Sequence, residues 1–317
     1  MRKKIVITDY GFPTIDYERE AAEKIDCDLV TGQCRTEEEV LELTKTADAI
    51  LAQWAPVSRK VIEGLENCKI IVRYGIGVDN VDLKAAKEMG IPVCNVPDYC
   101  IDEVADHAVA MGIALARQLT TTDKRVRSGN WKITPPLVMP PFREMTFATL
   151  GYGRIAREVL KRAAALGFKT AAYDPFVEAP EMKKNNVESL KLEQLLEGAD
   201  IISLHLPLND ATHHIINEAT IGQMKSQSII INTARGGLID NEALASALLN
   251  RRIGAAGLDV FEEEPLPVTH PLMSCDNTIL TSHTAWYSAS SIPVLQRMAM
   301  DELVRGLTGQ PLRNRVA

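Results

Sequence analysis

Short apolar, β-branched runs alternate with helical patterns along almost the whole chain. In the first hundred residues these runs cover residues 4–8, 28–30, 49–53, 70–73 and 93–95; later ones are FATLG, TAAYD, IISLHL, SIIINTA, AAGLDV and TILTS. Strands that alternate with helices form parallel sheets, because each parallel connection must cross back over one face of the sheet. The sequence therefore predicts an α/β protein with two doubly wound parallel sheets.

Two segments divide the series and suggest the domain organisation. The 317 residues suffice for two cores. A long, mostly apolar helix is predicted after Asp102, followed by a segment with Pro135, Pro136, Pro140 and Pro141, which cannot continue a helix or a central strand and predicts a connection into a second unit. A last helical pattern at residues 289–307 is expected to return to the first unit. We predict one domain from residues 1–101 and 288–317, another from residues 102–287, and a cleft between them.

Composition excludes several classes of partner. The formal charge is −7 and the pI is about 5.5, so no basic surface for nucleic acid is expected. No apolar run approaches the roughly 18 residues of a membrane span. The six cysteines are scattered and form no CxxC pair, which favours reduced thiols in a cytoplasmic protein. No spacing of His, Asp and Glu resembles a metal-ligand set, and His213 and His214 are expected to face solvent.

A glycine-rich turn opens the second series of strands. In LGYGRIA, Gly151 allows a tight turn after a strand, and Gly153 lets the backbone approach a pyrophosphate at a helix N-terminus. Ala156 takes the third glycine position, where close helix packing is the only requirement. Arg154 adds a charge-assisted contact to the anion.

Asp174 ends the next strand and completes this dinucleotide motif. Its carboxylate is expected to accept hydrogen bonds from the adenosine ribose and to repel a 2′-phosphate. No Lys or Arg occurs among residues 175–177 to neutralise such a phosphate. The sequence therefore favours NAD over NADP as cofactor.

Three residues at the ends of strands could carry out keto-acid chemistry. Reduction of a 2-keto acid needs a hydride donor, a cation for the substrate oxygens and a proton donor. Arg235 offers a planar fork for both oxygens, and His283 can donate the proton when the Glu264 carboxylate stabilises its imidazolium form. His205 also ends a strand, where packing near the cofactor is the favoured role. His107 and His270 have no catalytic context.

The motifs together resemble the D-isomer-specific 2-hydroxyacid dehydrogenase family. The blocks that carry the resemblance are LGYGRIA with Asp174, LLEGADIISLHLPLNDATHHIIN, MKSQSIIINTARGGLID, GLDVFEEEP and His283, and they span essentially the whole chain. The resemblance implies a flavodoxin-like substrate domain, a Rossmann NAD-binding domain and a homodimer built around the helix after Asp102. The predicted cofactor contacts are Gly151, Gly153, Arg154, Ile155, Asp174, His205, Pro207, Thr212, Thr233, Ala234 and Asp259.

The resemblance also implies roles in the substrate site. Arg235, Glu264 and His283 would be the catalytic set, Asp259 would lie near the nicotinamide carboxamide, and the product would be the D alcohol. Backbone N–H groups around Gly75, Ile76 and Gly77 would hold the substrate carboxylate, with Arg73 nearby. NVPDYCIDEVADH and SHTAWYSASS look closest to the C-terminal-binding-protein branch, in which Trp286 lines the pocket. Ala156, Gln227 and Ser282 depart from the usual pattern but leave the reaction class intact.

The substrate itself stays open at the level of sequence. No Lys or Arg occurs between Ala52 and Ser58, so a phosphorylated substrate is disfavoured. Trp54, Tyr74, Tyr99 and Trp286 either form an apolar wall for an extended 2-keto acid or pack between domains. Three alternatives remain: a phosphite-type dehydrogenase, a phosphoglycerate-type dehydrogenase, and an NAD-sensing scaffold that recruits other proteins and turns over slowly.

Overall fold

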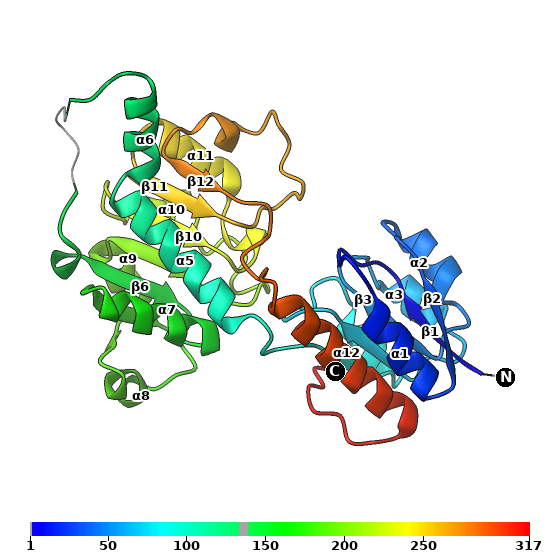
Figure 1. Cartoon of the computed structure of the whole chain (residues 1–317). Helices are drawn as coiled ribbons and strands as arrows, with labels where there is room; N and C mark the ends of the chain where they lie inside the picture. The colour runs from blue at the N-terminus through cyan, green and yellow to red at the C-terminus, as the bar shows by residue number, and fades with distance from the viewer. Residues whose placement is uncertain (1, 133–138) are drawn as a thin grey trace. The chain divides into compact units, whose positions relative to one another are not determined.

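The computed structural model describes residues 2–132 and 139–317, which form two compact units (Figure 1). One unit contains the residues up to Tyr99 together with Tyr287–Ala317, and the other contains Cys100–Trp286. Pro135 and Pro136 lie outside the described residues. The helices that precede the prolines belong to the same unit as the strands that follow them. The expectation that this segment connects the two units is therefore wrong.

The unit formed by the two ends of the chain is a five-stranded parallel sheet. Its strands are β1 (Lys3–Ile7), β2 (Cys27–Thr31), β3 (Ala49–Ala52), β4 (Ile70–Arg73) and β5 (Val93–Cys94), in the order β2-β1-β3-β4-β5. Its helices are α1 (Asp16–Lys24), α2 (Glu37–Thr44), α3 (Arg59–Glu63), α4 (Leu83–Glu88) and α12 (Ser291–Thr308). The strand order is that of flavodoxin-like sheets.

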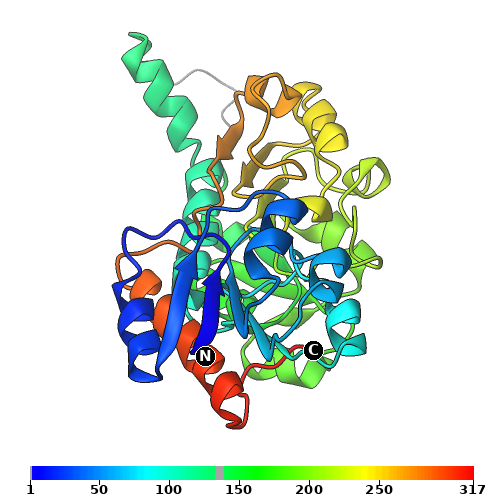
Figure 2. The same cartoon turned by 90° about the vertical axis from the view of Figure 1, so that its right-hand side faces the viewer.

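Helices cover both faces of this sheet. Helices α1 and α12 pack on one face, and α2, α3 and α4 lie on the other (Figure 2). The strand residues Val6, Ile50 and Ile71 are fully buried, as expected for a sheet covered on both sides. The capping box predicted by the Thr36 and Glu39 spacing is confirmed, because the Thr36 hydroxyl accepts from the Glu39 N–H at 3.3 Å and the Glu39 carboxylate accepts from the Thr36 N–H at 3.2 Å.

The second unit is a seven-stranded parallel sheet. Its strands are β6 (Thr146–Leu150), β7 (Lys169–Tyr173), β8 (Glu188–Ser189), β9 (Ile201–Leu204), β10 (Ile229–Asn232), β11 (Ala255–Leu258) and β12 (Thr278–Leu280), in the order β12-β11-β10-β9-β6-β7-β8. Leu150 at the end of β6 pairs with Tyr173 on one side and Leu204 on the other. The strand order therefore reverses between β6 and β9, and ligands of such sheets bind outside the carboxyl ends of the strands at this point.

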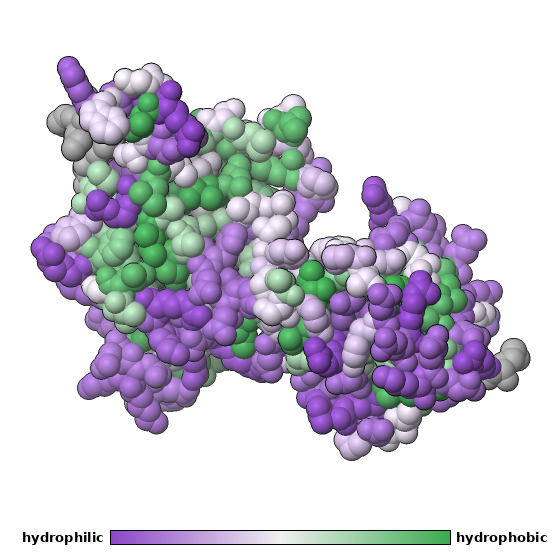
Figure 3. Space-filling model, in the orientation of Figure 1, coloured by the Kyte–Doolittle hydropathy of each residue, from purple (hydrophilic) through white to green (hydrophobic). Residues whose placement is uncertain are grey.

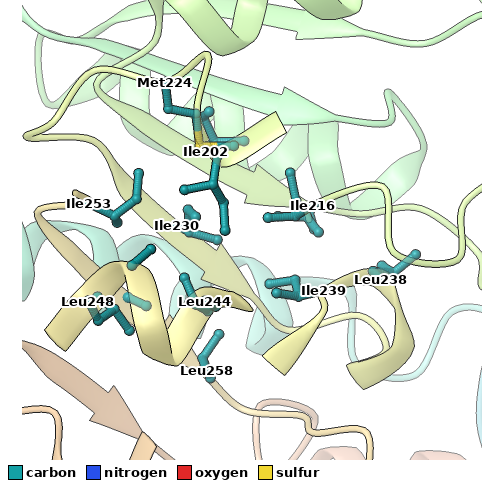
Figure 4. Packing of buried hydrophobic residues seen from close by; sticks show 14 of the residues in the cluster. Ile202, Ile216, Met224, Ile230, Leu238, Ile239, Leu244, Leu248, Ile253 and Leu258 are labelled. Carbon is teal, nitrogen blue, oxygen red and sulfur yellow. The ribbon is translucent and has the colours of Figure 1, made fainter. Parts of the chain in front are cut away.

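The helices of the second unit are α5 (Ile101–Ala116), α6 (Leu119–Arg127), α7 (Arg154–Ala165), α8 (Ala179–Lys184), α9 (Leu192–Gly198), α10 (Glu218–Ile221) and α11 (Asn241–Leu249), with 3-10 turns at Phe142–Glu144, Gly236–Leu238 and Pro271–Ser274. Helices α5 and α7 pack together on one face of the sheet. On the other face, Leu244 and Leu248 of α11 pack against Ile230 (Figure 4). The sequence missed α6, because the helix buries no residue and so leaves no apolar period to detect.

The prediction of two doubly wound parallel sheets is thus confirmed. Within the described residues, no helix combines the length and the apolar character needed to cross a bilayer. The six cysteines are free and buried.

Candidate active site

The glycine turn lies at the carboxyl end of β6, where the strand order of the sheet reverses. Gly151 has φ of +95°, and a Cβ there would lie 2.5 Å from the carbonyl oxygen of His205, so only glycine fits. A Cβ at Gly153 would meet no atom within 4 Å. No side chain caps α7, whose first-turn N–H groups start beside this open space. The turn therefore leaves room for an anionic group at a helix N-terminus.

Asp174 is held against the same turn. One carboxylate oxygen accepts from the Tyr152 N–H at 2.8 Å, and the other accepts from the Phe176 N–H at 2.9 Å. Each oxygen keeps a second lone pair for a further donor. Arg154 is exposed at the start of α7, and the adjacent Ile155 is half-buried.

Residues that follow β9 form the neighbouring wall of the glycine turn. The His205 ring lies 2.8 Å from the Ser203 hydroxyl, and burial lowers the pKa of His205 to about 3. This imidazole is therefore neutral at pH 7, which argues against a role as proton donor. The Thr212 hydroxyl donates to the Pro207 carbonyl at 2.6 Å and closes the turn between these two residues.

Arg235 follows β10, after Thr233 and Ala234. Its turn packs against the loop that contains Phe261. Its guanidinium donates to the Ala234 carbonyl at 2.6 Å. A Cβ at Gly236 would lie 1.9 Å from the Phe261 carbonyl oxygen. Glycine is therefore required at this position by the close approach of the two backbones.

His283 and Glu264 form a direct pair. The His283 Nδ1 lies 2.7 Å from the Glu264 Oε2, and the two side chains are 30% and 35% exposed. Burial acts to raise the pKa of Glu264, but the hydrogen bond and charge of His283 outweigh it, so that the pKa is lowered. The Phe261 N–H and the charge of Arg235 act in the same direction. Glu264 is thus an anion that orients the imidazole.

Asp259 anchors the loop that carries His283. Its buried carboxylate accepts from the N–H groups of Thr284 and Ala285, each at 2.9 Å, and its carbonyl accepts from the His283 N–H at 2.8 Å. These bonds hold His283 at φ of +54°, a conformation that histidine rarely adopts and that often marks functional sites.

The structure gives His107 a context that the sequence did not. Its Nε2 lies 3.1 Å from the Thr281 hydroxyl and 3.9 Å from Asp259. His107 thus lies beside Asp259, one of the predicted cofactor contacts. No sequence signal pointed to this contact, because α5 and β12 are far apart along the chain.

The predicted substrate residues of the first unit follow β4 and β3. The N–H of Gly75 donates to the Arg73 carbonyl at 2.9 Å and is already used, whereas the N–H groups of Ile76 and Gly77 have no acceptor among the described residues. Gly75 has φ of +144°, a backbone conformation that residues with a Cβ rarely adopt, so this position needs glycine. Trp54 is 47% exposed after β3.

The predicted aromatic wall is wrong for Tyr74. This side chain is 1% exposed, and its hydroxyl donates to Glu18 at 2.9 Å inside the core. Tyr99 is also buried, whereas Trp286 is half-buried and its indole N–H donates to the His283 carbonyl at 2.8 Å. Tyr74 thus belongs to the core of its own unit.

The second unit therefore brings together the predicted cofactor residues and the three predicted catalytic residues at the carboxyl end of its sheet. The sequence profile of the D-isomer-specific 2-hydroxyacid dehydrogenase NAD-binding domain matches residues 109–285. The chain belongs to the D-isomer-specific 2-hydroxyacid dehydrogenase family. The resemblance to the C-terminal-binding-protein branch stays a prediction.

Members of the family with assigned activities align over most of the chain. A glyoxylate reductase of Korarchaeum cryptofilum is 35% identical, over 86% of this chain and 83% of its own length. A hydroxypyruvate reductase of Thermotoga maritima is 38% identical, over 87% of this chain and 88% of its own length. A D-3-phosphoglycerate dehydrogenase of Methanocaldococcus jannaschii is 36% identical, but the alignment spans only 59% of that protein.

Solved structures agree with this assignment. The D-lactate dehydrogenase of Aquifex aeolicus, in complex with NAD and lactic acid, superposes with a TM-score of 0.88 at 27% identity, over 96% of each chain. The protein is therefore an NAD-dependent 2-hydroxyacid oxidoreductase. The open space beside Gly153 and the placement of Asp174 fit this cofactor.

Proposed function

We propose that the protein reduces a small, unphosphorylated 2-keto acid to its D-2-hydroxy acid, with Arg235, His283 and Glu264 as the catalytic set. The observation that carries this proposal is the 2.7 Å contact between His283 and Glu264. The positive charge of Arg235 also lowers the pKa of the Glu264 carboxyl. A proton donor and a substrate-binding cation thus meet at the end of the sheet where the cofactor binds.

The cofactor contacts follow from the glycine turn. Gly151 and Gly153 would place the pyrophosphate at the N-terminus of α7, and Asp174 would accept from the adenosine ribose. We assign further contacts to Arg154, Ile155, His205, Pro207, Thr212, Thr233, Ala234 and Asp259. When bound, NADH supplies the hydride for the keto carbon.

The chain's own residues bind the substrate and move the proton. The Arg235 guanidinium holds the carboxylate and the keto oxygen through its planar fork. The Glu264 anion engages Nδ1 of His283, and no hydrogen bond among the described residues involves Nε2. This nitrogen is thus available to protonate the keto oxygen, and in the reverse direction it accepts the proton.

We also assign substrate contacts to residues of the first unit. The N–H groups of Ile76 and Gly77 suit a carboxylate, and Arg73 adds a positive charge. Trp54 and Trp286 would contact the substrate side chain. The absence of Lys and Arg between Ala52 and Ser58 supports an unphosphorylated substrate, as do the names of the glyoxylate and hydroxypyruvate reductases.

We also propose a homodimer built around α5 and α6. Leu119 and Val126 of α6 are 53% and 50% exposed, and Trp131 just beyond is 85% exposed. Figure 3 shows apolar surface over the part of the second unit that contains α5, whereas the surface over α6 is mostly hydrophilic. Exposed apolar surface of this kind commonly marks an interface. Sedimentation analysis of the wild type and of Trp131→Ala tests this arrangement.

The test of the reaction is NADH oxidation followed by absorbance with glyoxylate, hydroxypyruvate, pyruvate, phenylpyruvate and 3-phosphohydroxypyruvate. We expect turnover of a small unphosphorylated acid, with kcat at least about 100-fold lower in His283→Ala. His270→Gln is the matched control, because His270 also contacts a carboxylate, that of Glu242 at 3.5 Å, outside the catalytic set. Its kcat should equal that of the wild type.

Two outcomes would contradict the proposal. Tight NADH binding without turnover of any acid would favour the scaffold alternative. Turnover only of 3-phosphohydroxypyruvate, or only of phosphite with NAD, would replace the substrate class proposed here.

A further inference from the structure

A second cluster of ligating side chains lies apart from the catalytic pair. His213 and His214 come from the turn after β9, and Glu262 comes from the loop after β11. One ligand atom from each of the three residues can be chosen so that all lie within 4.8 Å of one another. The expectation that both histidines simply face solvent is wrong for His214, which is half-buried. The sequence missed the cluster because Glu262 is 48 residues beyond His214.

The two imidazoles are held side by side. Their ring centroids are 3.9 Å apart, and the ring planes are inclined by 22°. The backbone N–H of His214 donates to the Gly237 carbonyl at 2.9 Å, and the backbone N–H of His213 donates to the Asn209 carbonyl at 2.8 Å. The backbone of both ligands is therefore fixed before any ion binds, which lowers the entropic cost of binding.

Glu262 is oriented by a second residue. Its Oε2 accepts from the backbone N–H of Asn241 at 2.9 Å, at the start of α11, and its Oε1 lies 2.6 Å from the Nε2 of His214. Ligands of metal sites commonly have such supporting hydrogen bonds, which set the direction of the lone pairs. The cluster thus has two imidazoles and one positioned carboxylate.

We propose that His213, His214 and Glu262 form a binding site for a divalent transition-metal ion of the zinc type. Two histidines and one carboxylate are a common zinc ligand set, with solvent as the fourth ligand. Bonds of about 2.1 Å in a tetrahedron place ligand atoms about 3.4 Å apart. The ligand atoms here lie within 4.8 Å of one another, so each pair must approach by at most about 1.4 Å, which side-chain rotations can provide. Imidazole ligands also disfavour Ca²⁺ and Mg²⁺, which prefer oxygen.

Other histidine–carboxylate pairs of the second unit are poorer candidates. The His283–Glu264 pair feels the positive charge of Arg235, which repels a cation. His270 faces Glu242 at 3.5 Å and belongs to no cluster of three ligating groups among the described residues. His270 is therefore a matched control, with one imidazole and one carboxylate but no second imidazole.

The experiment is calorimetric titration of the full-length apo protein with Zn²⁺, and Co²⁺ absorption reports the ligand field. We expect one equivalent to bind to the wild type, His213→Ala and Glu262→Gln each to weaken binding at least about tenfold, and His270→Gln to bind like the wild type. His213 is exposed, so its variant should keep the metal-free melting temperature and kcat. Zn²⁺ should raise the melting temperature of the wild type and His270→Gln more than that of the other two variants.

Binding that persists unchanged in His213→Ala and Glu262→Gln would overturn the proposal, because the ion would then lie elsewhere. Absence of saturable binding below about 100 μM in the wild type would overturn it as well. Neither readout requires a keto acid, so failure of the metal site and failure of the proposed reaction are distinguishable.

Discussion

Gly153 and Gly151 lie two residues apart in the cofactor turn, and an alanine at each is expected to have a different effect. At Gly153, φ is −73° and ψ is −167°, which alanine adopts readily, and the added Cβ meets no atom within 4 Å. At Gly151, φ is +95° and the Cβ would lie 2.5 Å from the His205 carbonyl oxygen. Gly153→Ala therefore tests whether the cofactor occupies the open space beside this residue, and Gly151→Ala tests whether the turn requires glycine for stability.

The magnitudes follow from these geometries. Gly153→Ala exchanges glycine for a poorer N-cap and should cost about 0.5–1 kcal/mol of stability. Its methyl group occupies the proposed pyrophosphate space. Loss of one hydrogen bond to a charged group costs about 1.5–3 kcal/mol, which corresponds to roughly 10- to 150-fold weaker NADH binding.

Gly151→Ala should act mainly on stability. A left-handed conformation costs alanine about 1–2 kcal/mol. The backbone shift that relieves the contact with His205 adds about 1–3 kcal/mol, as for other overpacked sites. A total near 3 kcal/mol lowers the melting temperature by roughly 6–12 °C for a unit of this size.

The assays are NADH fluorescence titration and thermal unfolding of the wild type and both variants. We expect Gly153→Ala to lose affinity with a melting temperature close to that of the wild type, and Gly151→Ala to melt well below both. Wild-type NADH affinity in Gly153→Ala would refute the placement of the pyrophosphate. An unchanged melting temperature in Gly151→Ala would refute the steric argument.

Three further predictions concern other parts of the chain. Asp174→Ala should lower the NADH preference over NADPH by about tenfold or more in kcat/KM, because it removes the charge that repels a 2′-phosphate; an unchanged ratio contradicts the assignment. Gly236→Ala should lower kcat and the melting temperature together, because its Cβ would lie 1.9 Å from the Phe261 carbonyl oxygen; wild-type values for both would contradict this. Burial raises the pKa of Glu18 in the folded protein. The protonated carboxyl therefore stabilises the fold at low pH, and this stabilisation is lost as the pH rises through the pKa of the folded state. Glu18→Gln keeps a partner for the Tyr74 hydroxyl, and its melting temperature relative to the wild type should rise from about pH 4 to about pH 8; a falling difference would contradict the raised pKa.

The elements predicted well from sequence are those with strong local signals. The strand at residues 70–73 was predicted with its observed bounds, because a buried parallel strand is apolar throughout. The capping box at Thr36 needs only residues three apart. Helix α6 and the two-residue strand β8 were missed, because α6 buries no residue and β8 is too short to show a period.

Side-chain direction was the main source of error. Tyr74 lies beside the substrate motif in sequence, which predicts a place for its aromatic ring in a pocket wall or between domains. The structure buries it against Phe12, with the ring centroids 5.1 Å apart, and pairs its hydroxyl with Glu18. A pattern of neighbouring residues does not reveal which core will cover a ring, because the covering residues lie more than 50 positions away.

The sequence by itself determined the two parallel sheets, the glycine turn and the family, because periodicity and motif spacing are local properties of the chain. Only the tertiary structure decided which distant groups meet. It placed His107 near Asp259 and Glu262 beside His214, and it decided that Glu264 engages Nδ1 of His283. Such contacts form where the ends of different strands converge, at sequence separations from 19 to 152 residues for which no local pattern exists.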